Sequence, residues 1–136
     1  MRLGIVGSRT FPDQLVRDYV DRLEEHTVVI TGGWSAYAGR LEATPGVDRI
    51  AYRRAEERGL VTVLCVGSKT KHGRLAGLQR NPTIATLSEH VVAFWDLKSR
   101  GTMDTLRWCI QLQRPVTVIN PDGHGVDDWA RHVQDR

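Results

Sequence analysis

In residues 2–25 the sequence reads RLGIVGSRTFPDQLVRDYVDRLEE, and this stretch decides the fold. Residues 2–7 form a short apolar run that ends in glycine, which predicts a buried strand. Residues 13–25 carry apolar side chains at helical spacing, which predicts a helix. A strand followed directly by a helix is the unit from which α/β folds are built.

The same unit repeats along the rest of the chain. Further strands are expected at 27–31, 60–66, 90–95 and 115–120, and further helices at 47–58, 77–87, 102–113 and 126–133. The strands show no polar alternation, which indicates a parallel sheet covered by helices on both faces. With right-handed crossovers, this predicts an α/β fold with a three-layer, Rossmann-like, five-stranded parallel sheet of order 3-2-1-4-5. The ligand crevice of such a sheet lies beyond the carboxyl ends of its strands, where the order reverses between strands one and four.

Length and composition indicate one globular domain over residues 1–136, with 40% hydrophobic and 26% charged residues. No apolar run approaches the roughly 20 residues of a membrane span. The apolar N-terminal run ends without a cleavage-site pattern, so we expect a cytoplasmic protein. A net charge of +3 and a pI near 9.2 favour an anionic partner. The basic residues are scattered, so a small anionic ligand fits as well, and nucleic acid is not expected.

Neither a metal nor a cofactor is expected. Cys65 and Cys109 lie in apolar stretches without a CxxC spacing, which favours packed thiols. The five histidines show no ligand spacing. The sequence also contains neither a GxxxxGK(S/T) loop nor a GxSxG elbow, which argues against phosphoryl transfer of the P-loop kind and against serine-hydrolase chemistry.

Candidate binding residues follow the first two strands. Gly7-Ser8-Arg9 either holds a phosphate, through exposed N–H groups, a hydroxyl and a guanidinium, or forms a plain turn. Gly32-Gly33 and Gly46 allow a close approach to a ligand. Asp48 either accepts hydrogen bonds from ribose or caps the next helix. Trp34 either stacks on a base or pins the loop that contains it.

A second group of candidates lies near the later strands. Arg80 and Asn81 place a cation and an amide near the same edge, with a solvent-facing helical arginine as the alternative. Residues 96–102, DLKSRGT, present hydroxyls and N–H groups at a helix start, which suits an anion or an ordinary N-cap. Trp95 either stacks on a ring or completes the core. The expected binding residues are Gly7, Ser8, Arg9, Gly32, Gly33, Trp34, Gly46, Asp48, Arg80, Asn81, Trp95, Asp96, Ser99, Gly101 and Thr102.

Five short motifs occur in order along the chain: GSR at 7–9, TGG at 31–33, GVD at 46–48, AGxxRN at 76–81 and AFWDxxSRGT at 93–102. Together they resemble the SLOG superfamily, and most of all its small, stand-alone YspA-like branch, which is related to the DprA and LOG proteins. The resemblance covers roughly residues 1–120. It implies a Rossmann-like fold that binds nucleotides or nucleotide-derived signals, with some relatives cutting the base–ribose bond of nucleoside monophosphates.

Two features depart from that family. The hydrolase branch carries PGGxGTxxE, whereas here Thr102 is followed by Met103, Asp104 and Thr105, so the catalytic carboxylate is absent from its expected place. The remaining candidates for that role are Asp48, Asp96 and Asp104. The second departure is an insert at 34–45, bounded by Gly33 and Gly46, which we expect to be an irregular loop acting either as a lid or as a static surface or subunit contact.

The leading expectation is therefore a protein that senses, carries or sequesters a nucleotide-derived small molecule, such as an ADP-ribose-like ligand. The alternative is a nucleoside-monophosphate N-glycoside hydrolase, and a third hypothesis is single-stranded DNA binding of the DprA kind. A homodimer or higher homo-oligomer is left open.

Overall fold

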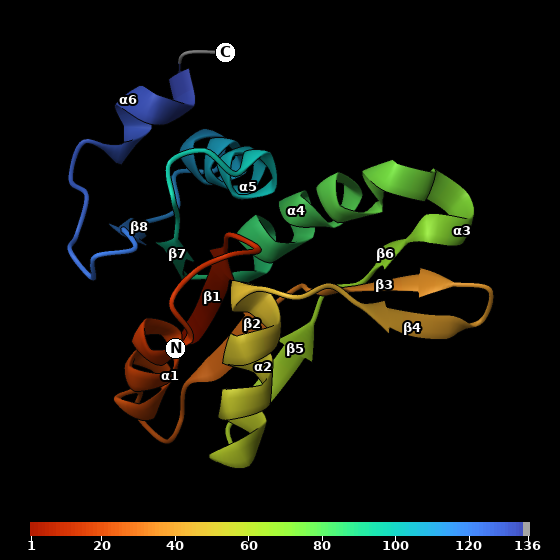
Figure 1. The fold of residues 1–136 in the computed structure, drawn as a ribbon, viewed down its shortest axis with the longest axis horizontal. Coiled ribbons are helices and arrows are strands. Elements are labelled where there is room, and N and C mark those ends of the chain that lie inside the picture. Colours follow the sequence, from red (N-terminus) through yellow and green to blue (C-terminus); the bar gives the residue numbers. More distant parts are fainter. Residues whose placement is uncertain (135–136) are drawn as a thin grey trace.

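The computed structural model describes residues 1–134, and its central feature is a five-stranded, all-parallel sheet (Figure 1). Its strands are β1 (Arg2–Gly7), β2 (Val28–Thr31), β5 (Val61–Leu64), β7 (His90–Phe94) and β8 (Val116–Ile119). They lie in the order β5-β2-β1-β7-β8, and every neighbouring pair is parallel. This is the order 3-2-1-4-5 of the sheet's own strands, so the predicted fold class and strand order are confirmed. The expected domain also included residues 135–136, which lie outside the described residues.

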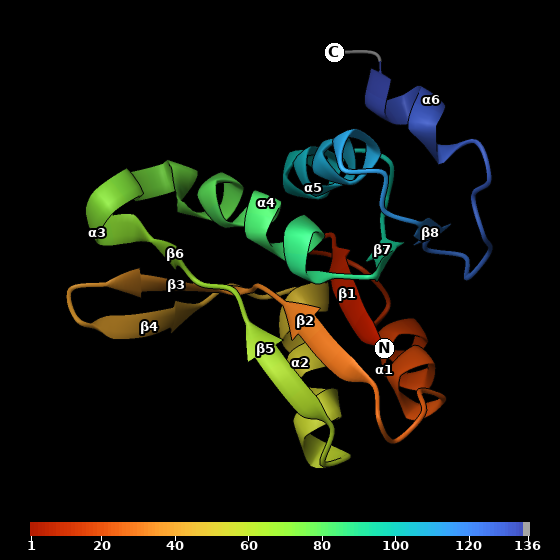
Figure 2. The ribbon, with the colours of Figure 1, turned by 180° about the vertical axis from the view of Figure 1, so that it is seen from behind.

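Helices cover both faces of the sheet (Figures 1 and 2). One face packs against α1 (Asp13–Asp21) and α2 (Val47–Glu57), and the other against α4 (Ala76–Leu87), α5 (Arg100–Gln111) and α6 (Trp129–Gln134). Adjacent residues of a strand point to opposite faces, so Ile5 enters one buried cluster and Val6 the other. The three layers therefore have two separate cores.

A second, three-stranded sheet extends past the carboxyl edge of the main sheet (Figure 1). It contains β3 (Trp34–Tyr37), β4 (Arg40–Ala43) and the short β6 (Gly67–Ser68), in the order β4-β3-β6. Strands β3 and β4 form an antiparallel hairpin. The short helices α3 (Lys69–His72) and η1 (Gly73–Leu75) follow β6 and lead into α4.

The hairpin corrects the expectation that residues 34–45 form an irregular loop. Its turn contains Ala38 and Gly39, both with positive φ, 50° and 80°. Hairpin turns of the I′ type require positive φ at both central positions, and their usual signals are Asn-Gly or Asp-Gly. An Ala-Gly pair carries only half of that signal, which is why the sequence pattern did not predict the hairpin.

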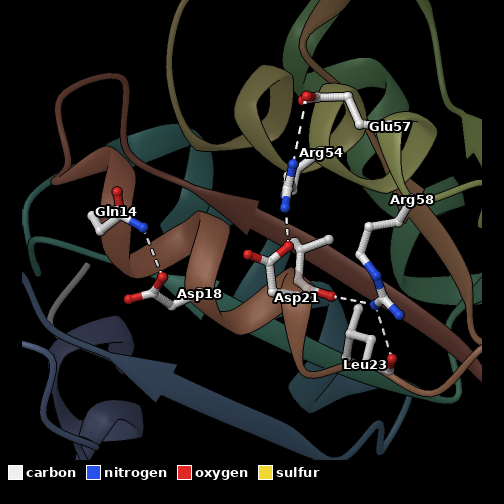
Figure 3. A network of polar contacts seen from close by, with 8 residues as sticks. Gln14, Asp18, Asp21, Leu23, Arg54, Glu57 and Arg58 are labelled. Carbon is white, nitrogen blue, oxygen red and sulfur yellow. Dashed lines mark hydrogen bonds and ion pairs between the residues drawn. The ribbon is translucent and has the colours of Figure 1, made fainter.

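Helices α1 and α2 are joined by a polar network (Figure 3). The Arg58 guanidinium donates to the carbonyl oxygens of Val20 and Leu23, at 2.7 and 2.8 Å. Arg54 Nε donates to Asp21 Oδ1 at 2.6 Å. These contacts hold the C-terminal end of α1, which stops at Asp21 rather than at the expected residue 25. Among residues 1–134, the structure contains no helix that is both long and apolar enough to cross a membrane.

Candidate functional site

The carboxyl edge of the main sheet opens into a cavity of about 470 Å³. Its walls come from the ends of β1 and β7, the starts of α2 and α5, helix α4 and the small sheet. Strand order reverses between β1 and β7 at this point, so the cavity lies where the sequence pattern places the ligand crevice.

Most of the expected binding residues line this cavity. They are Gly7, Arg9, Gly33, Gly46, Asp48, Arg80, Asn81, Asp96, Ser99, Gly101 and Thr102. The folded chain thus brings together five motifs that are far apart in the sequence. Four expected residues are not in the lining: Ser8, Gly32, Trp34 and Trp95.

Ser8 and Trp95 have structural contacts instead. Ser8 is buried, and its hydroxyl oxygen accepts a hydrogen bond from the Asp96 N–H at 3.1 Å, which joins the ends of β1 and β7. Trp95 is fully buried, and its ring N–H donates to the Ser99 carbonyl at 3.1 Å. Both side chains therefore shape the cavity from behind rather than facing it, which corrects their expected role in direct contact with a ligand.

Gly32 and Trp34 help to position the Arg80 side chain. A Cβ atom on Gly32 would lie 2.8 Å from Arg80 Cζ, so the glycine makes room for the guanidinium. The Trp34 carbonyl accepts from Arg80 Nη1 at 3.1 Å. The Trp34 ring packs edge-to-face on Tyr52, with 4.8 Å between ring centroids, which is the pinning role rather than base stacking.

Arg80 is a cation set deep in the cavity wall. Its Nε atom is buried and finds no hydrogen-bond partner among the described residues. A buried charged donor without a partner is costly, because it gives up its bonds to water. An anion at the cavity wall would reduce that cost, so Arg80 favours a negatively charged ligand.

Asp48 faces Arg80 from the start of α2. Burial raises the pKa of Asp48 to about 6, although the Arg80 charge and the backbone N–H groups of Gly32, Gly7 and Asp48 itself act in the opposite direction. The side chain is enclosed by protein but keeps partial exposure to the cavity. The cavity therefore loses one negative charge as the pH falls through about 6.

Asp96 holds the start of α5 in place. Its Oδ1 atom accepts from the backbone N–H groups of Lys98 and Ser99, at 2.9 and 2.8 Å. Burial acts to raise the pKa of Asp96, but these bonds and those from the Ser99 and Ser8 hydroxyls together lower it. An ionised carboxylate that accepts these bonds closes the turn before α5, which fits a structural role better than proton transfer. The N-cap residue of α5, Ser99, makes no side-chain capping bond within the described part of the chain.

Asn81 joins α4 to α5. Its side-chain amide is buried and donates to the Gly101 carbonyl at 3.2 Å and to Asp104 Oδ2 at 3.0 Å. Asp104 lies outside the cavity lining, whereas Asp48 and Asp96 belong to it. The three carboxylates considered for catalysis therefore do not converge on one point.

The sequence pattern did not identify several polar residues of the lining. They are Thr10, Ser35, Thr44, Lys69, Arg100 and Thr105. Lys69 belongs to α3, which no pattern predicted, and Ser35 to the unexpected hairpin. Arg100 stands inside the SRGT motif, and that motif was the available signal for it.

Cations outnumber carboxylates around the cavity. The lining contains four cations, Arg9, Lys69, Arg80 and Arg100, and two carboxylates, Asp48 and Asp96. Lys69 also forms an ion pair with Glu42 at 3.3 Å. Within residues 1–134, no cluster of three or more histidine, cysteine, aspartate or glutamate side chains could hold a metal ion. The arrangement is suited to binding an anion through several guanidinium and ammonium groups at once.

The fold is similar to that of a solved DNA-binding protein. DNA processing protein A (DprA) from Helicobacter pylori, described for its unique single-stranded DNA binding mode, superposes with a TM-score of 0.60 and 21% sequence identity. The match covers 88% of this chain and 65% of the other, so the chain spans a little under two thirds of that protein. No protein-family model and no curated protein sequence matches the chain.

This likeness corrects two expectations. The sequence pattern favoured a nucleotide-derived small molecule as the ligand, with a nucleotide hydrolase as the alternative, and it did not favour nucleic acid as a partner. The comparison contradicts both the expected function and the expected partner, because the protein of similar structure binds single-stranded DNA. Basic residues that are scattered along a sequence do not by themselves predict a nucleic-acid surface, yet folding brings four of them, Arg9, Lys69, Arg80 and Arg100, to one edge of the sheet.

Proposed function

We propose that this chain binds single-stranded DNA, and that the phosphate backbone enters the cavity at the carboxyl edge of the main sheet. The observation that carries the proposal is the gathering of Arg9, Lys69, Arg80 and Arg100 around one cavity, in a fold similar to that of a single-stranded DNA-binding protein. Phosphate contacts of this kind supply most of the sequence-independent affinity for nucleic acid.

The chemistry of the lining supports backbone recognition rather than base recognition. Among the described residues, the cavity lining combines four cations with hydroxyls, glycines, two carboxylates and a few small or aliphatic side chains, and it contains no aromatic side chain. Single-strand-binding proteins stack bases on aromatic rings, and hydrogen bonds to base edges give sequence preference. We therefore expect binding with strong salt dependence and little sequence preference.

The order of the five motifs supports a finer family assignment. We propose that the chain belongs to the SLOG superfamily and, within it, to the YspA-like branch. We also propose that residues 1–136 form one domain. Two clusters of buried residues on the two faces of a single sheet support that assignment.

Fluorescence anisotropy with a labelled deoxythymidine oligomer tests the function. The protein should bind the single strand more tightly than a duplex of the same length, and the affinity should fall steeply with salt. The variants Arg9→Ala and Arg100→Ala each remove an exposed cation of the cavity and should weaken binding about 10-fold at low salt.

Arg131→Ala is the matched control, since this exposed arginine lies on α6, outside the cavity. It should bind as the wild type does. Equal losses of affinity in all three variants would mean that only the net charge of the protein affects binding. No binding of the single strand by the wild type would refute the proposal.

A further inference from the structure

A second groove adjoins the cavity on the side of α1 and α2. It has a volume of about 380 Å³ and shares Arg9, Pro45 and Gly46 with the cavity. Its other walls come from Asp13 and Arg17 of α1, and from Arg49, Ile50, Arg53 and Glu57 of α2. The two hollows are therefore neighbours, separated by the segment that precedes α2.

Four arginines dominate this groove. Arg9, Arg17, Arg49 and Arg53 make no ion pair and no side-chain hydrogen bond within residues 1–134. The acidic groups on the groove are Asp13 and Glu57, and Glu57 already lies 3.5 Å from Arg54. The groove consequently has an excess of unpaired positive charge.

Arg49 and Arg53 are spaced i and i+4 on α2. Like charges at this spacing destabilise a helix by about 0.2–0.5 kcal/mol, so helix formation alone does not favour the pair. Arg54 and Arg58, at the C-terminal end of the same helix, make the structural contacts that tie α2 to α1 (Figure 3). The basic residues of this segment thus fall into two sets, one that supports the fold and one that lines the groove without partners.

That network also keeps the groove in shape. The Arg54–Asp21 ion pair and the bonds from Arg58 join α2 to the last turn of α1 and the residues that follow it, so the separation of the two helices does not depend on Arg49 or Arg53. One helical turn separates Arg49 from Arg53, about 6 Å along the axis, a spacing that suits neighbouring phosphates of an extended strand.

We infer that this groove is a second phosphate-binding segment, which holds the part of a single strand that leaves the cavity past Arg9. The inference rests on the proposed function and adds the direction of the strand: from the cavity, over Pro45 and Gly46, and between α1 and α2. A strand confined to the cavity does not reach Arg49 and Arg53, whereas a longer one contacts both.

Two labelled deoxythymidine oligomers test the inference, one of about 4 nucleotides and one of about 16, the range of site sizes of single-strand-binding modules. Each is titrated at several salt concentrations with the wild type and with the double variant Arg49→Ala/Arg53→Ala. The loss of two phosphate contacts should weaken binding of the long oligomer about 10-fold or more and lower its salt slope by about 1.4. Binding of the short oligomer should not change.

Two further double variants serve as controls. Arg22→Ala/Arg131→Ala removes the same charge from exposed positions outside both hollows and should behave as the wild type. Arg49→Lys/Arg53→Lys keeps the charge and should retain the salt slope. Thermal unfolding should show that all variants fold, because the side chains of Arg49 and Arg53 form neither a hydrogen bond nor an ion pair within residues 1–134.

The different failures are distinguishable. Equal losses of affinity for the short and the long oligomer, or no loss for either, would contradict DNA binding in the groove but not DNA binding in the cavity. DNA binding in the groove would also be contradicted if the wild type bound the short and the long oligomer with the same affinity and the same salt slope. No binding of either oligomer by the wild type would overturn the proposed function and the inference together.

Discussion

At the scale of the residue, Arg80 and Gly32 depend on each other. The guanidinium lies where a side chain at position 32 would stand, with Cζ only 2.8 Å from the place of a Cβ atom. The sequence pattern identified both residues as ligand contacts, because glycines and arginines near strand ends are common in phosphate sites. It could not show that one of them makes room for the other, since that relation depends on the distance between β2 and α4.

Replacing this glycine should therefore disturb the site from behind. Gly32→Ala forces the Arg80 guanidinium out of its place, and because this is the far end of a flexible side chain we expect a loss of only about 1 kcal/mol in the free energy of unfolding, the low end of the cost of overpacking. Urea denaturation measures it. Gly101→Ala is the control, because a Cβ atom there meets nothing within 4 Å and the residue lies in helix α5. Equal stability of the two variants would show that Arg80 yields without cost.

Asp48 makes stability depend on pH. Its pKa is raised to about 6 in the folded protein, against 3.8 when unfolded, so the folded state holds the proton over that interval. The stabilisation is fully present below about pH 4 and is lost as the pH rises through about 6, with a size of about 3 kcal/mol. Asp48→Asn should remove this contribution. An unchanged pH profile in the variant, measured by urea denaturation, would assign the dependence to another group.

At the scale of the element, most strands and helices could be predicted and the small sheet could not. The strands of the main sheet are continuous apolar runs, and the helices carry clear periodicity, so their order followed from general rules of α/β folds. Strands β3 and β4 are as long as β2, β5 and β8, with four residues each, but their sequences WSAY and RLEA mix polar and apolar residues and leave Tyr37 and Leu41 exposed. Strand β6 has only two residues. None of the three is the continuous apolar run that indicates a buried strand.

The turn of the β3–β4 hairpin can be tested directly by substitution. Ala38 adopts φ of 50°, a region that costs an ordinary residue about 1–2 kcal/mol and that asparagine tolerates better. Ala38→Asn would convert the turn to the favoured Asn-Gly pair, and we expect an increase of about 0.5–1 kcal/mol in the free energy of unfolding. Thermal unfolding measures it. A loss of stability would mean that the turn differs from the one described.

At the scale of the whole molecule, the charge that matters is assembled by folding. Arg9 follows β1, Lys69 lies in α3, Arg80 in α4 and Arg100 at the start of α5. The sequence therefore predicted the edge of the sheet at which the cavity opens, whereas the class of ligand that it favoured is contradicted by the likeness to a single-stranded DNA-binding protein. A net charge of +3 over 136 residues does not reveal that four cations converge on one cavity and that three more follow along the next groove.

The most direct test of the central claim is amide hydrogen exchange with and without a deoxythymidine oligomer. If single-stranded DNA occupies the cavity, protection should increase at residues 7–10, 44–48 and 99–102, which lie in three separate segments of its wall. Residues 129–134 of α6, outside the cavity lining, should exchange at the same rate in both samples. Protection confined to α6, or no change anywhere at an oligomer concentration that saturates binding, would contradict the claim.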